Sequence, residues 1–341
     1  MTVLFGQNGQ GKSNLLEAAY YAITFRSFRT SSSADLLMWG AQEATVEAGL
    51  TLRGLERTLR VRLAPGKKST TLDGKGVRRD SESLDGAGVV IFGPDDLRLP
   101  KAAAAERRRA IDRAVFAVHR GYFREALGFE RALKARNGLL RRGEWSRDLL
   151  ESYDETLATT GARIVLRRRE LATSLAPRFR EAFADIHGDL TANIRYRSDA
   201  RVETAERESE IREAIRLGLE AHRAVDQRRG FTGFGPHTDD LEILLGDRLA
   251  RDHGSQGQIR SLMLAFKFAE LRYVEEANRE TPVLLLDDVA SELDEERRTR
   301  LFETISVTAC QTLLTVTEAG LLPDLPGRVD WRVRGGHIEP P

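Results

Sequence analysis

Gly6-Gln7-Asn8-Gly9-Gln10-Gly11-Lys12-Ser13 stands near the start of the chain, after an apolar run at residues 2–5 and before a segment at 14–22 with the apolar spacing of a helix. It fits the pattern G-x-x-x-x-G-K-[ST] of a phosphate-binding loop, in the strand, loop and helix context that this loop requires. Backbone N–H groups must close around phosphate oxygens, and side chains at the glycines would obstruct them. The simpler alternative, a glycine-rich turn before a helix, leaves the Lys-Ser pair unexplained.

The loop predicts a nucleotide site with a second half further along the chain. Lys12 would reach the β- and γ-phosphates, and Ser13 would give its hydroxyl to Mg²⁺ at the positive end of the following helix. The apolar residues 282–286 end in Asp287 and Asp288, as a buried parallel strand of such a site does. Asp287 would then be the second metal ligand, and Asp288 would polarise the attacking water. Apolar strands that end in two aspartates are common, but a phosphate-binding loop in the same chain makes this strand a specific sign of a nucleotide site.

The two halves of this site are 275 positions apart, so a large insertion splits one compact domain. The composition changes at Pro100, and residues 102–224 read as almost entirely helical. We therefore expect a nucleotide-binding head at 1–100 and 231–341, with an inserted helical lobe at 101–230. Asn137-Gly138 and Arg142-Gly143 should break helices, and Pro177 should end or restart the long helix that begins near residue 151.

A second anion-binding turn is expected at Ser255-Gln256-Gly257-Gln258, which opens a helix 32 positions before Asp287. The turn offers a hydroxyl and the free N–H groups of a helix N-terminus. Because the first loop already holds the phosphates, this turn would most usefully serve a nucleotide bound to another copy of the protein. The alternative is an ordinary helix cap at Ser255.

Composition limits the possible classes of protein. The chain has 341 residues, of which 41% are hydrophobic and 31% charged, and no apolar run approaches the length of a membrane span. Cys310 is the one cysteine, which excludes an intramolecular disulfide and a cysteine-based zinc site. No secretory leader is recognisable at the N-terminus, and we expect a cytoplasmic protein without a membrane partner.

The net charge is only +1, but its distribution is uneven. Residues 101–181 contain 19 Lys and Arg against 11 Asp and Glu, a local excess of +8. Such a field can present a basic face to a polyanion, and solvated helix faces paired with glutamates are the alternative. The candidate phosphate contacts are Arg107, Arg108, Arg141, Arg142, Arg167 and Arg168.

Taken in order, these motifs resemble the ATP-binding-cassette heads of the SMC class and, more closely, the RecF family of bacterial recombination mediators. The matching stretches run from Gly6 to Ala18, from Phe92 to Leu97 with Glu106-Arg107-Arg108-Arg109 and Asp112, from Gly235 to Leu241, from Ser255 to Gln258, and from Leu285 to Asp294. The resemblance implies an α/β P-loop NTPase head, with a mixed sheet and an antiparallel β layer, that carries an inserted α-helical lobe. It also implies an ATP-dependent homodimer that binds DNA at gaps and, with RecR and RecO, helps to load RecA.

The resemblance also assigns roles to single residues. It places Asp294 at the dimer seam and lets Ser255 and Gly257 contact the γ-phosphate held by the partner subunit. Related transport ATPases carry glutamate where Asp288 stands, so turnover should be slow and the ATPase activity weak. The expected ATP contacts are Gly6, Asn8, Gly9, Gly11, Lys12, Ser13, Asn14, Ser255, Gln256, Gly257 and Asp287, with Ser13 and Asp287 on Mg²⁺ and with Lys12 and Asp288 catalytic.

Other functions stay open from the sequence. A chromosome-organising SMC protein is one alternative, but it would need a longer insertion than this chain has. The ATPase subunit of a transporter is another, but it would have no long helical insertion. The chain begins five residues before Gly6, where relatives carry a strand that helps to seat the base. The expectation is that this strand segment is missing, and an inactive fragment made from a late start codon is therefore a further alternative.

Overall fold

The computed structural model describes residues 1–30, 32–77, 84, 86–143, 145–187, 190–308 and 310–339. The chain divides into two compact units, one made of Met1–Arg98 with Arg260–Pro341 and the other of Leu99–Ile259. The first boundary lies close to the expected residue 100. The second differs from the expected residue 231, because residues 231–259 contribute a strand pair and short helix to the inserted unit.

A six-stranded mixed sheet forms the centre of the first unit, in the order β13-β12-β1-β11-β10-β6. Its strands are β1 (Thr2–Phe5), β6 (Val89–Phe92), β10 (Val283–Asp287), β11 (Thr312–Val316), β12 (Val329–Arg334) and β13 (His337–Glu339). Five of them run parallel, and β13 pairs antiparallel with β12. The inner strands are nearly continuous apolar runs, as a sheet covered on both faces requires, and Leu285 and Leu314 are fully buried.

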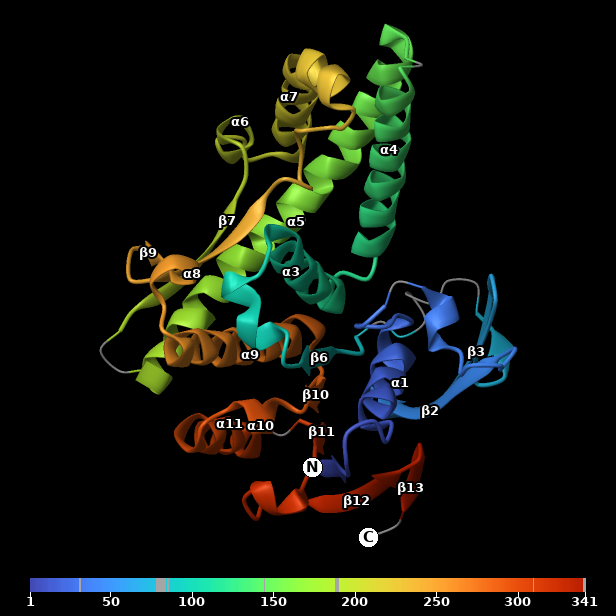
Figure 1. Cartoon of the computed structure of the whole chain (residues 1–341), viewed down its shortest axis with the longest axis vertical. Coiled ribbons are helices and arrows are strands. Elements are labelled where there is room, and N and C mark those ends of the chain that lie inside the picture. Colours follow the sequence, from blue (N-terminus) through green and yellow to red (C-terminus); the bar gives the residue numbers. More distant parts are fainter. Residues whose placement is uncertain are drawn as a thin grey trace. The chain divides into compact units, whose positions relative to one another are not determined.

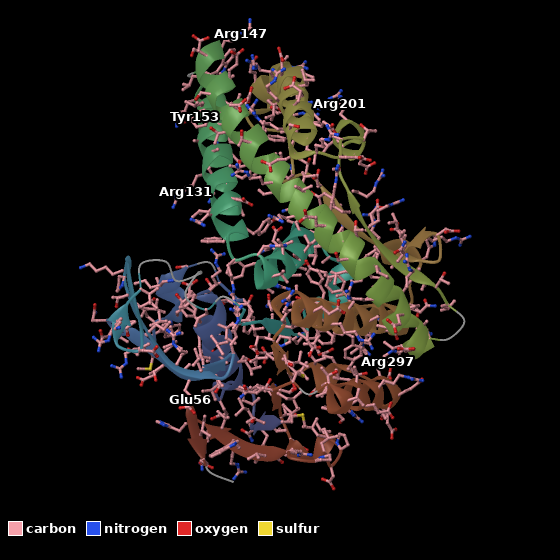
Figure 2. The ribbon with its side chains drawn as sticks, turned by 180° about the vertical axis from the view of Figure 1, so that it is seen from behind. Glu56, Arg131, Arg147, Tyr153, Arg201 and Arg297 are labelled. Carbon is pink, nitrogen blue, oxygen red and sulfur yellow. The ribbon has the colours of Figure 1, made fainter. Side chains whose placement is uncertain are left out.

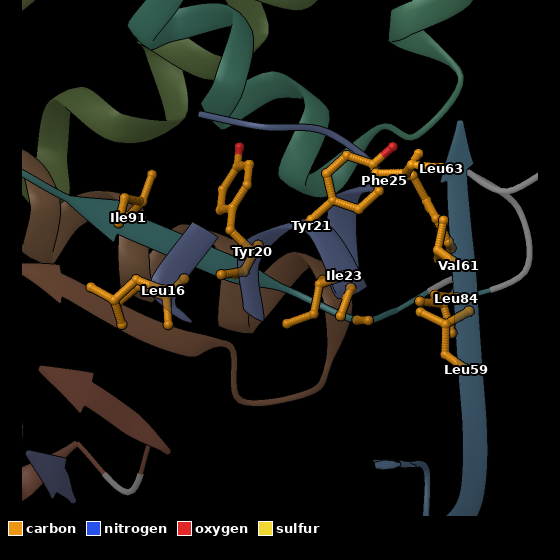
Figure 3. Packing of buried hydrophobic residues seen from close by; sticks show 14 of the residues in the cluster. Leu16, Tyr20, Tyr21, Ile23, Phe25, Leu59, Val61, Leu63, Leu84 and Ile91 are labelled. Atoms are coloured by element: carbon orange, nitrogen blue, oxygen red, sulfur yellow. The ribbon is translucent and has the colours of Figure 1, made fainter. Parts of the chain in front are cut away.

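The helix after the phosphate loop, α1 (Lys12–Thr24), joins this sheet to a second, antiparallel one. That sheet has the order β2-β3-β4-β5, from β2 (Ala44–Leu52), β3 (Leu55–Ala64), β4 (Lys67–Leu72) and β5 (Lys75–Gly76). Leu16 and Tyr20 of α1 lie in one apolar cluster with Leu59 and Val61 of β3 (Figure 3). The alternation of buried and exposed residues along β3 arises because successive side chains of a strand point to opposite faces.

The remaining helical elements of the first unit lie between its strands along the chain. They are α9 (Gln256–Asn278), which begins in the other unit, α10 (Val289–Glu292) and α11 (Glu295–Val307), with the short 3-10 turns η1 (Ser33–Leu36) and η3 (Ala319–Leu321). Parallel strands need such helical crossovers, which place the loops after the strands at one edge of the sheet.

The second unit is mainly helical (Figure 1). It holds α3 (Ala104–Val118), α4 (Tyr122–Arg142), α5 (Arg147–His187), α6 (Ala200–Glu203), α7 (Glu208–Arg229) and α8 (Ala250–His253), and η2 (Asp96–Lys101) leads into it. A three-stranded sheet in the order β7-β8-β9 completes it, with β7 (Ala192–Arg197), β8 (Asp240–Leu245) and β9 (Arg248–Leu249). Both α4 and α7 pack along α5. Among the helices that the structure describes, none combines the length and the apolar character that crossing a membrane would take.

Two sequence-based expectations about helix ends were wrong. Pro177 lies inside α5, because the buried stripe continues through Leu175 and Phe179, and this burial offsets the hydrogen bond that proline cannot donate. Asn137-Gly138 lies inside α4, where Asn137 binds a neighbouring segment through its side chain. Gly143 does end α4, with a left-handed φ of 70°.

Candidate functional site

The loop at residues 6–13 has the shape of a phosphate cradle. A Cβ at Gly6 would lie 2.4 Å from the Val333 carbonyl oxygen, so a larger residue cannot stand there. Gly11 has a φ of 95°, and a Cβ on it would lie 3.3 Å from the Gly336 Cα. Helix α1 begins directly afterwards, with no side-chain cap and no acidic residue in its first turn. Its free N–H groups and the positive end of its dipole can therefore serve an anion.

The ammonium group of Lys12 lies where it can bind a phosphate held by the loop. The side chain is buried, and Nζ donates to the backbone oxygens of Gly6 at 2.6 Å and Gln7 at 3.0 Å. An ammonium group has three protons to donate, and two of them are used here. Among the described residues no carboxylate forms an ion pair with Lys12, and a phosphate held by the loop would supply the opposite charge.

The structure brings Ser13 and Asp287 together across 274 positions of sequence. Ser13 Oγ donates to Asp287 Oδ1 at 2.8 Å, and Thr315 Oγ1 donates to the same oxygen at 2.9 Å. Thr315 is fully buried and stands opposite Asp287 in the pairing of β10 with β11. The motifs of the sequence did not single out this residue, although a threonine after the apolar pair Leu313-Leu314 was the available signal.

Hydroxyl and carboxylate oxygens are ligands that Mg²⁺ prefers. Ser13 and Asp287 therefore fit a magnesium ion whose other ligands are phosphate oxygens and water. Among the residues that the structure describes, no group of three or more His, Cys, Asp and Glu side chains gathers to hold a metal without such help.

Asp288 stands at the turn between β10 and α10 in the left-handed conformation, with a φ of 52°. Its N–H donates to Thr315 Oγ1 at 2.9 Å, and its Oδ1 accepts from Ser291 Oγ at 2.7 Å. Aspartate tolerates this conformation better than most residues. The turn thus presents a half-exposed carboxylate directly after the metal-ligand candidate Asp287.

The C-terminal hairpin supports the loop in a way that the sequence analysis missed. Gly336 N donates to Gln10 O at 2.9 Å, and Gly335 N donates to Gln10 Oε1 at 2.7 Å. The turn between β12 and β13 therefore holds the residue that precedes Gly11. The sequence contains a Gly-Gly hairpin turn there, but nothing in the sequence indicates that this turn bonds to Gln10.

Two other expected nucleotide contacts lie on the exposed side of the same loop and helix. Asn8 is exposed, and no hydrogen bond of its side chain is among those described. The Asn14 Oδ1 accepts from Arg29 Nη1 at 3.0 Å, and Arg29 also lies 3.6 Å from the Glu17 carboxylate. Nucleotide binding by Asn14 would therefore have to compete with Arg29.

The turn at Ser255 belongs to the second unit and forms a reciprocal helix cap. Ser255 N donates to Gln258 Oε1 at 2.9 Å, and Gln258 N donates to Ser255 Oγ at 3.2 Å. The Ser255 and Gln256 side chains are exposed, and Gly257 is half-buried. The cap that we considered as the alternative is present, and it leaves the turn accessible to another molecule.

Asp294, expected at a dimer seam, caps α11. Its Oδ1 accepts from the Arg297 N–H at 3.0 Å, and Arg297 also reaches Ser261 Oγ at 2.9 Å. The aspartate itself is exposed.

Three candidate phosphate contacts are instead committed to bonds inside the second unit. Arg107 is buried and binds both carboxylate oxygens of Asp240, each at 2.7 Å. Arg168 is buried and holds Asp112 in the same two-pronged manner, and Arg108 donates to the Asp239 carbonyl at 2.6 Å. Desolvation, followed by the neighbouring Arg168, lowers the pKa of Arg108. Arg107 and Arg108 bind α3 to the start of β8, and Arg168 binds α5 to α3. The expectation that Arg107 and Arg168 face DNA phosphates is wrong because both side chains are buried in these bonds.

The remaining three candidates lie nearer to solvent. Arg141 and Arg142 are exposed at the end of α4, whereas half-buried Arg167 forms an ion pair with Glu170 at 2.9 Å.

Comparisons with known proteins agree with this architecture. Residues 1–325 match the family model for the RecF/RecN/SMC N-terminal domain. The chain is 42% identical to the DNA replication and repair protein RecF of Myxococcus xanthus, over 94% of this chain and 86% of that protein. It is 41% identical to the protein of the same name from Anaeromyxobacter dehalogenans, over 99% of this chain and 92% of that protein.

Solved structures give the same result. The recombination mediator protein RecF-ATPrS of the RecFOR pathway superposes with a TM-score of 0.90 at 30% identity, covering 99% of this chain and 91% of that one. An Smc head bound to the C-terminal winged-helix domain of ScpA shares the fold, with a TM-score of 0.54 at 19% identity. With a family model that spans most of its length and relatives that align over nearly all of it, the chain belongs to the RecF family and has the P-loop ATPase head fold of the SMC class.

Proposed function

We propose that this protein is an ATP-dependent DNA-binding protein of recombinational repair and replication restart. In this proposal two copies dimerise on gapped DNA around bound ATP, and slow hydrolysis releases them. The observation that carries the proposal is the convergence of Lys12, Ser13 and Asp287 on the glycine loop. A solved relative is described as RecF-ATP, which supports ATP as the nucleotide.

Each residue has a distinct task in this mechanism. The loop N–H groups and Lys12 would bind the β- and γ-phosphates, and Ser13 and Asp287 would hold Mg²⁺, which neutralises the charge of those phosphates when it is bound. Asp288 would orient a water and accept its proton through the carboxylate oxygen that Ser291 leaves free. Its carboxylate is one methylene shorter than a glutamate would be, which places the base less closely and supports slow turnover.

The exposed turn at Ser255 supports the proposed dimer. Ser255, Gln256 and Gly257 would approach the γ-phosphate held by the partner copy, so that one nucleotide contacts both proteins. Two relatives are named for DNA replication and repair, and a solved one for the RecFOR pathway, which supports DNA, RecR and RecO as partners. RecA is the recombinase that this proposal adds.

The experiment is a mass measurement in solution, by light scattering, with Mg²⁺ and ATP and with or without a gapped duplex. The intact chain should form a dimer that binds the duplex, and both Lys12→Ala and Ser255→Arg should abolish the dimer. Lys101→Ala and Ser209→Arg are the matched controls, because both residues are exposed and Ser209 also lies in the first turn of a helix. If the intact chain stayed monomeric and bound no nucleotide, or if Ser255→Arg dimerised normally, the proposal would be overturned.

A further inference from the structure

Thr315 is a polar residue at a fully buried position of β11. An inner strand of a parallel sheet is covered on both faces, and the neighbours Leu314 and Val316 are fully buried apolar residues. Exposed polar side chains, such as that of Glu56 on β3 in Figure 2, reach solvent and need no internal partner. Thr315 has no exposed surface, so its hydroxyl group depends entirely on hydrogen bonds within the protein.

The hydroxyl group of Thr315 binds two consecutive residues of the candidate site. A hydroxyl has one proton to donate, and Oγ1 lies 2.9 Å from Asp287 Oδ1 but 3.5 Å from the Leu286 carbonyl oxygen. A carboxylate also forms the stronger bond, so the proton goes to Asp287. The same Oγ1 accepts from the Asp288 N–H at 2.9 Å. One side chain is therefore bonded both to the metal-ligand candidate and to the residue proposed to act on the attacking water.

The bond to Asp287 fixes the direction of its carboxylate. Ser13 and Thr315 both donate to Oδ1, the first from the helix after the phosphate loop and the second from the neighbouring strand. Ser13 would itself bind Mg²⁺ in the proposed site, whereas Thr315 belongs to the buried sheet and would act on the metal only through Asp287. Partners of this kind hold a metal ligand in the orientation in which it binds.

The bond from Asp288 stabilises a left-handed turn. Asp288 has a φ of 52°, a conformation that costs free energy in any residue with a Cβ. Its N–H points to Thr315 Oγ1, so the hydroxyl group helps to hold the backbone in this conformation. The Asp288 carboxylate projects from the same turn, and its direction depends on the conformation that Thr315 stabilises.

A second threonine of β11 is buried without this role. Thr312 is 1% exposed, and its Oγ1 lies 3.4 Å from the Cys310 carbonyl oxygen and 3.5 Å from the Cys310 Sγ. It stands opposite Leu284, three residues before Asp287. Thr312 therefore has the same residue type, strand and burial as Thr315, and its hydrogen bonds in the described part of the chain stay with Cys310.

We propose that Thr315 is a positioning residue of the nucleotide site. Its hydroxyl group sets the orientation of Asp287 toward Mg²⁺ and stabilises the turn that directs Asp288 toward the attacking water. The inference rests on the proposed ATP-dependent function and adds the residue that holds its two carboxylates in place.

The test measures binding of a fluorescent ATP analogue by the full chain at a series of Mg²⁺ concentrations and in EDTA. Thr315→Val has nearly the same shape but no hydroxyl group, and the Mg²⁺ concentration for half-maximal binding should rise about 10–100-fold. In EDTA the variant and the intact chain should bind the analogue equally, because Thr315 acts through the metal ligand. Thr315→Ser keeps the hydroxyl group and should restore the Mg²⁺ requirement, and Thr312→Val should leave it unchanged.

Hydrolysis is the second measurement and reports on the bond to Asp288. At saturating Mg²⁺ and ATP, Thr315→Val should form the ATP-dependent dimer but release phosphate about tenfold more slowly than the intact chain. Thr315→Ser should restore the rate. An unchanged Mg²⁺ requirement together with an unchanged rate in Thr315→Val would overturn the inference. A loss of affinity that is equal in Mg²⁺ and in EDTA would also contradict it, because such a loss would show damage to the whole site.

Thr315→Val leaves the Asp288 N–H without its partner, so a variant with a smaller effect on folding is included. Thr315→Cys keeps a weaker donor, and it should need several-fold more Mg²⁺ than Thr315→Ser even where Thr315→Val does not fold. Equal Mg²⁺ requirements of these two variants would count against Thr315.

The intact chain in the same assays separates the two proposals. An intact chain that binds no ATP analogue in Mg²⁺ would overturn the proposed function and the inference with it. An intact chain that binds and hydrolyses ATP, beside a Thr315→Val variant that behaves identically, would remove the role of Thr315 alone.

Discussion

Asp287 accepts two hydroxyl hydrogen bonds on Oδ1, and Oδ2 is the oxygen that would bind the proposed metal ion. We predict that Asp287→Asn keeps the fold, because an amide oxygen can accept the same bonds, and the unfolding free energy should change by less than about 1.5 kcal/mol. The loss of the negative charge should lower affinity for Mg²⁺ and ATP by at least about tenfold. Titration with a fluorescent ATP analogue, with Mg²⁺ and then with EDTA, checks this. Equal Mg²⁺ dependence in both proteins would remove Asp287 from the metal site.

Asp288 belongs to the hydrolytic step and not to binding in the proposed mechanism. Asp288→Asn should keep the ATP-dependent dimer and lower the hydrolysis rate by about 10²–10⁴-fold, as the loss of a general base does. Phosphate release measured alongside dimer mass separates the two properties. A rapid steady-state ATPase of the intact chain in the presence of DNA would contradict the slow turnover that the short carboxylate predicts.

Asp239 gives the protein a pH-dependent contribution to stability. Burial raises the pKa of this carboxyl from 3.8 to about 6, even though Tyr196 donates a hydrogen bond to it. The folded chain therefore keeps a proton that the unfolded chain releases, and the stability from this group is full below about pH 4 and is lost as the pH rises through 6. Two pKa units correspond to about 3 kcal/mol.

The measurement compares urea unfolding of the intact chain and Asp239→Asn. The unfolding free energy of the intact chain minus that of the variant should fall by about 3 kcal/mol between pH 4 and pH 7. Asp247→Asn, at an exposed carboxylate, is the control for the loss of one charge. A difference that does not vary with pH would show that Asp239 titrates alike in both states.

Among the elements, the hairpin of β12 and β13 acts on the phosphate loop through Gln10. Gln10→Ala removes the bond from Gly335 and leaves the one from Gly336 to the backbone. We expect an unfolding free energy lower by about 1 kcal/mol and a several-fold weaker affinity for ATP, because the loop loses part of its support. Gln7→Ala, at an exposed side chain of the same loop, should change neither. Thermal unfolding of both variants measures the change in stability, and nucleotide titration measures the change in affinity for ATP.

The packing of α4 and α7 on α5 depends on one buried cation. Arg136→Met would leave Asp154 and Asp226 with less compensation for their charge, and we expect a loss of about 3–5 kcal/mol in unfolding free energy. Arg163→Met removes an exposed ion pair with Glu208 and should cost less than about 1 kcal/mol. Urea unfolding measures both changes. Equal small losses would show that Arg136 does not hold the helices together.

For the whole molecule, a nucleotide that binds the folded head must raise its melting temperature. Mg²⁺ and ATP at about a hundred times the dissociation constant should stabilise the intact chain by about 2.7 kcal/mol, and Lys12→Ala should gain almost nothing. Because the phosphate loop lies in the first of the two units, any separate transition of the second unit should shift less in a dilute sample. Scanning calorimetry measures both transitions. If Mg²⁺ and ATP stabilised Lys12→Ala as much as the intact chain, the nucleotide would bind at a site other than the phosphate loop.

Much of this architecture could be predicted, because its signals are local. The phosphate loop follows from contiguous residues, and its presence in the chain made the strand that ends in Asp287 and Asp288 specific. The long insertion follows from the spacing between these two motifs. The second unit boundary and the course of α5 through Pro177 could not, because burial on neighbouring elements overrides the local preference of a residue.

The sequence by itself determined which groups are available for the proposed chemistry: a glycine loop with Lys12 and Ser13, and a distant carboxylate that would complete a metal site. Only the tertiary structure decided which side chains meet. It placed Thr315 on Asp287 through strand register, tied Gln10 to the C-terminal hairpin, and turned Arg107 and Arg168 inward while leaving Arg141 exposed. The reason is that the sequence of a helix does not show whether an arginine in it is buried or exposed. The partner of a buried arginine lies far away in the chain, and only packing brings the two together.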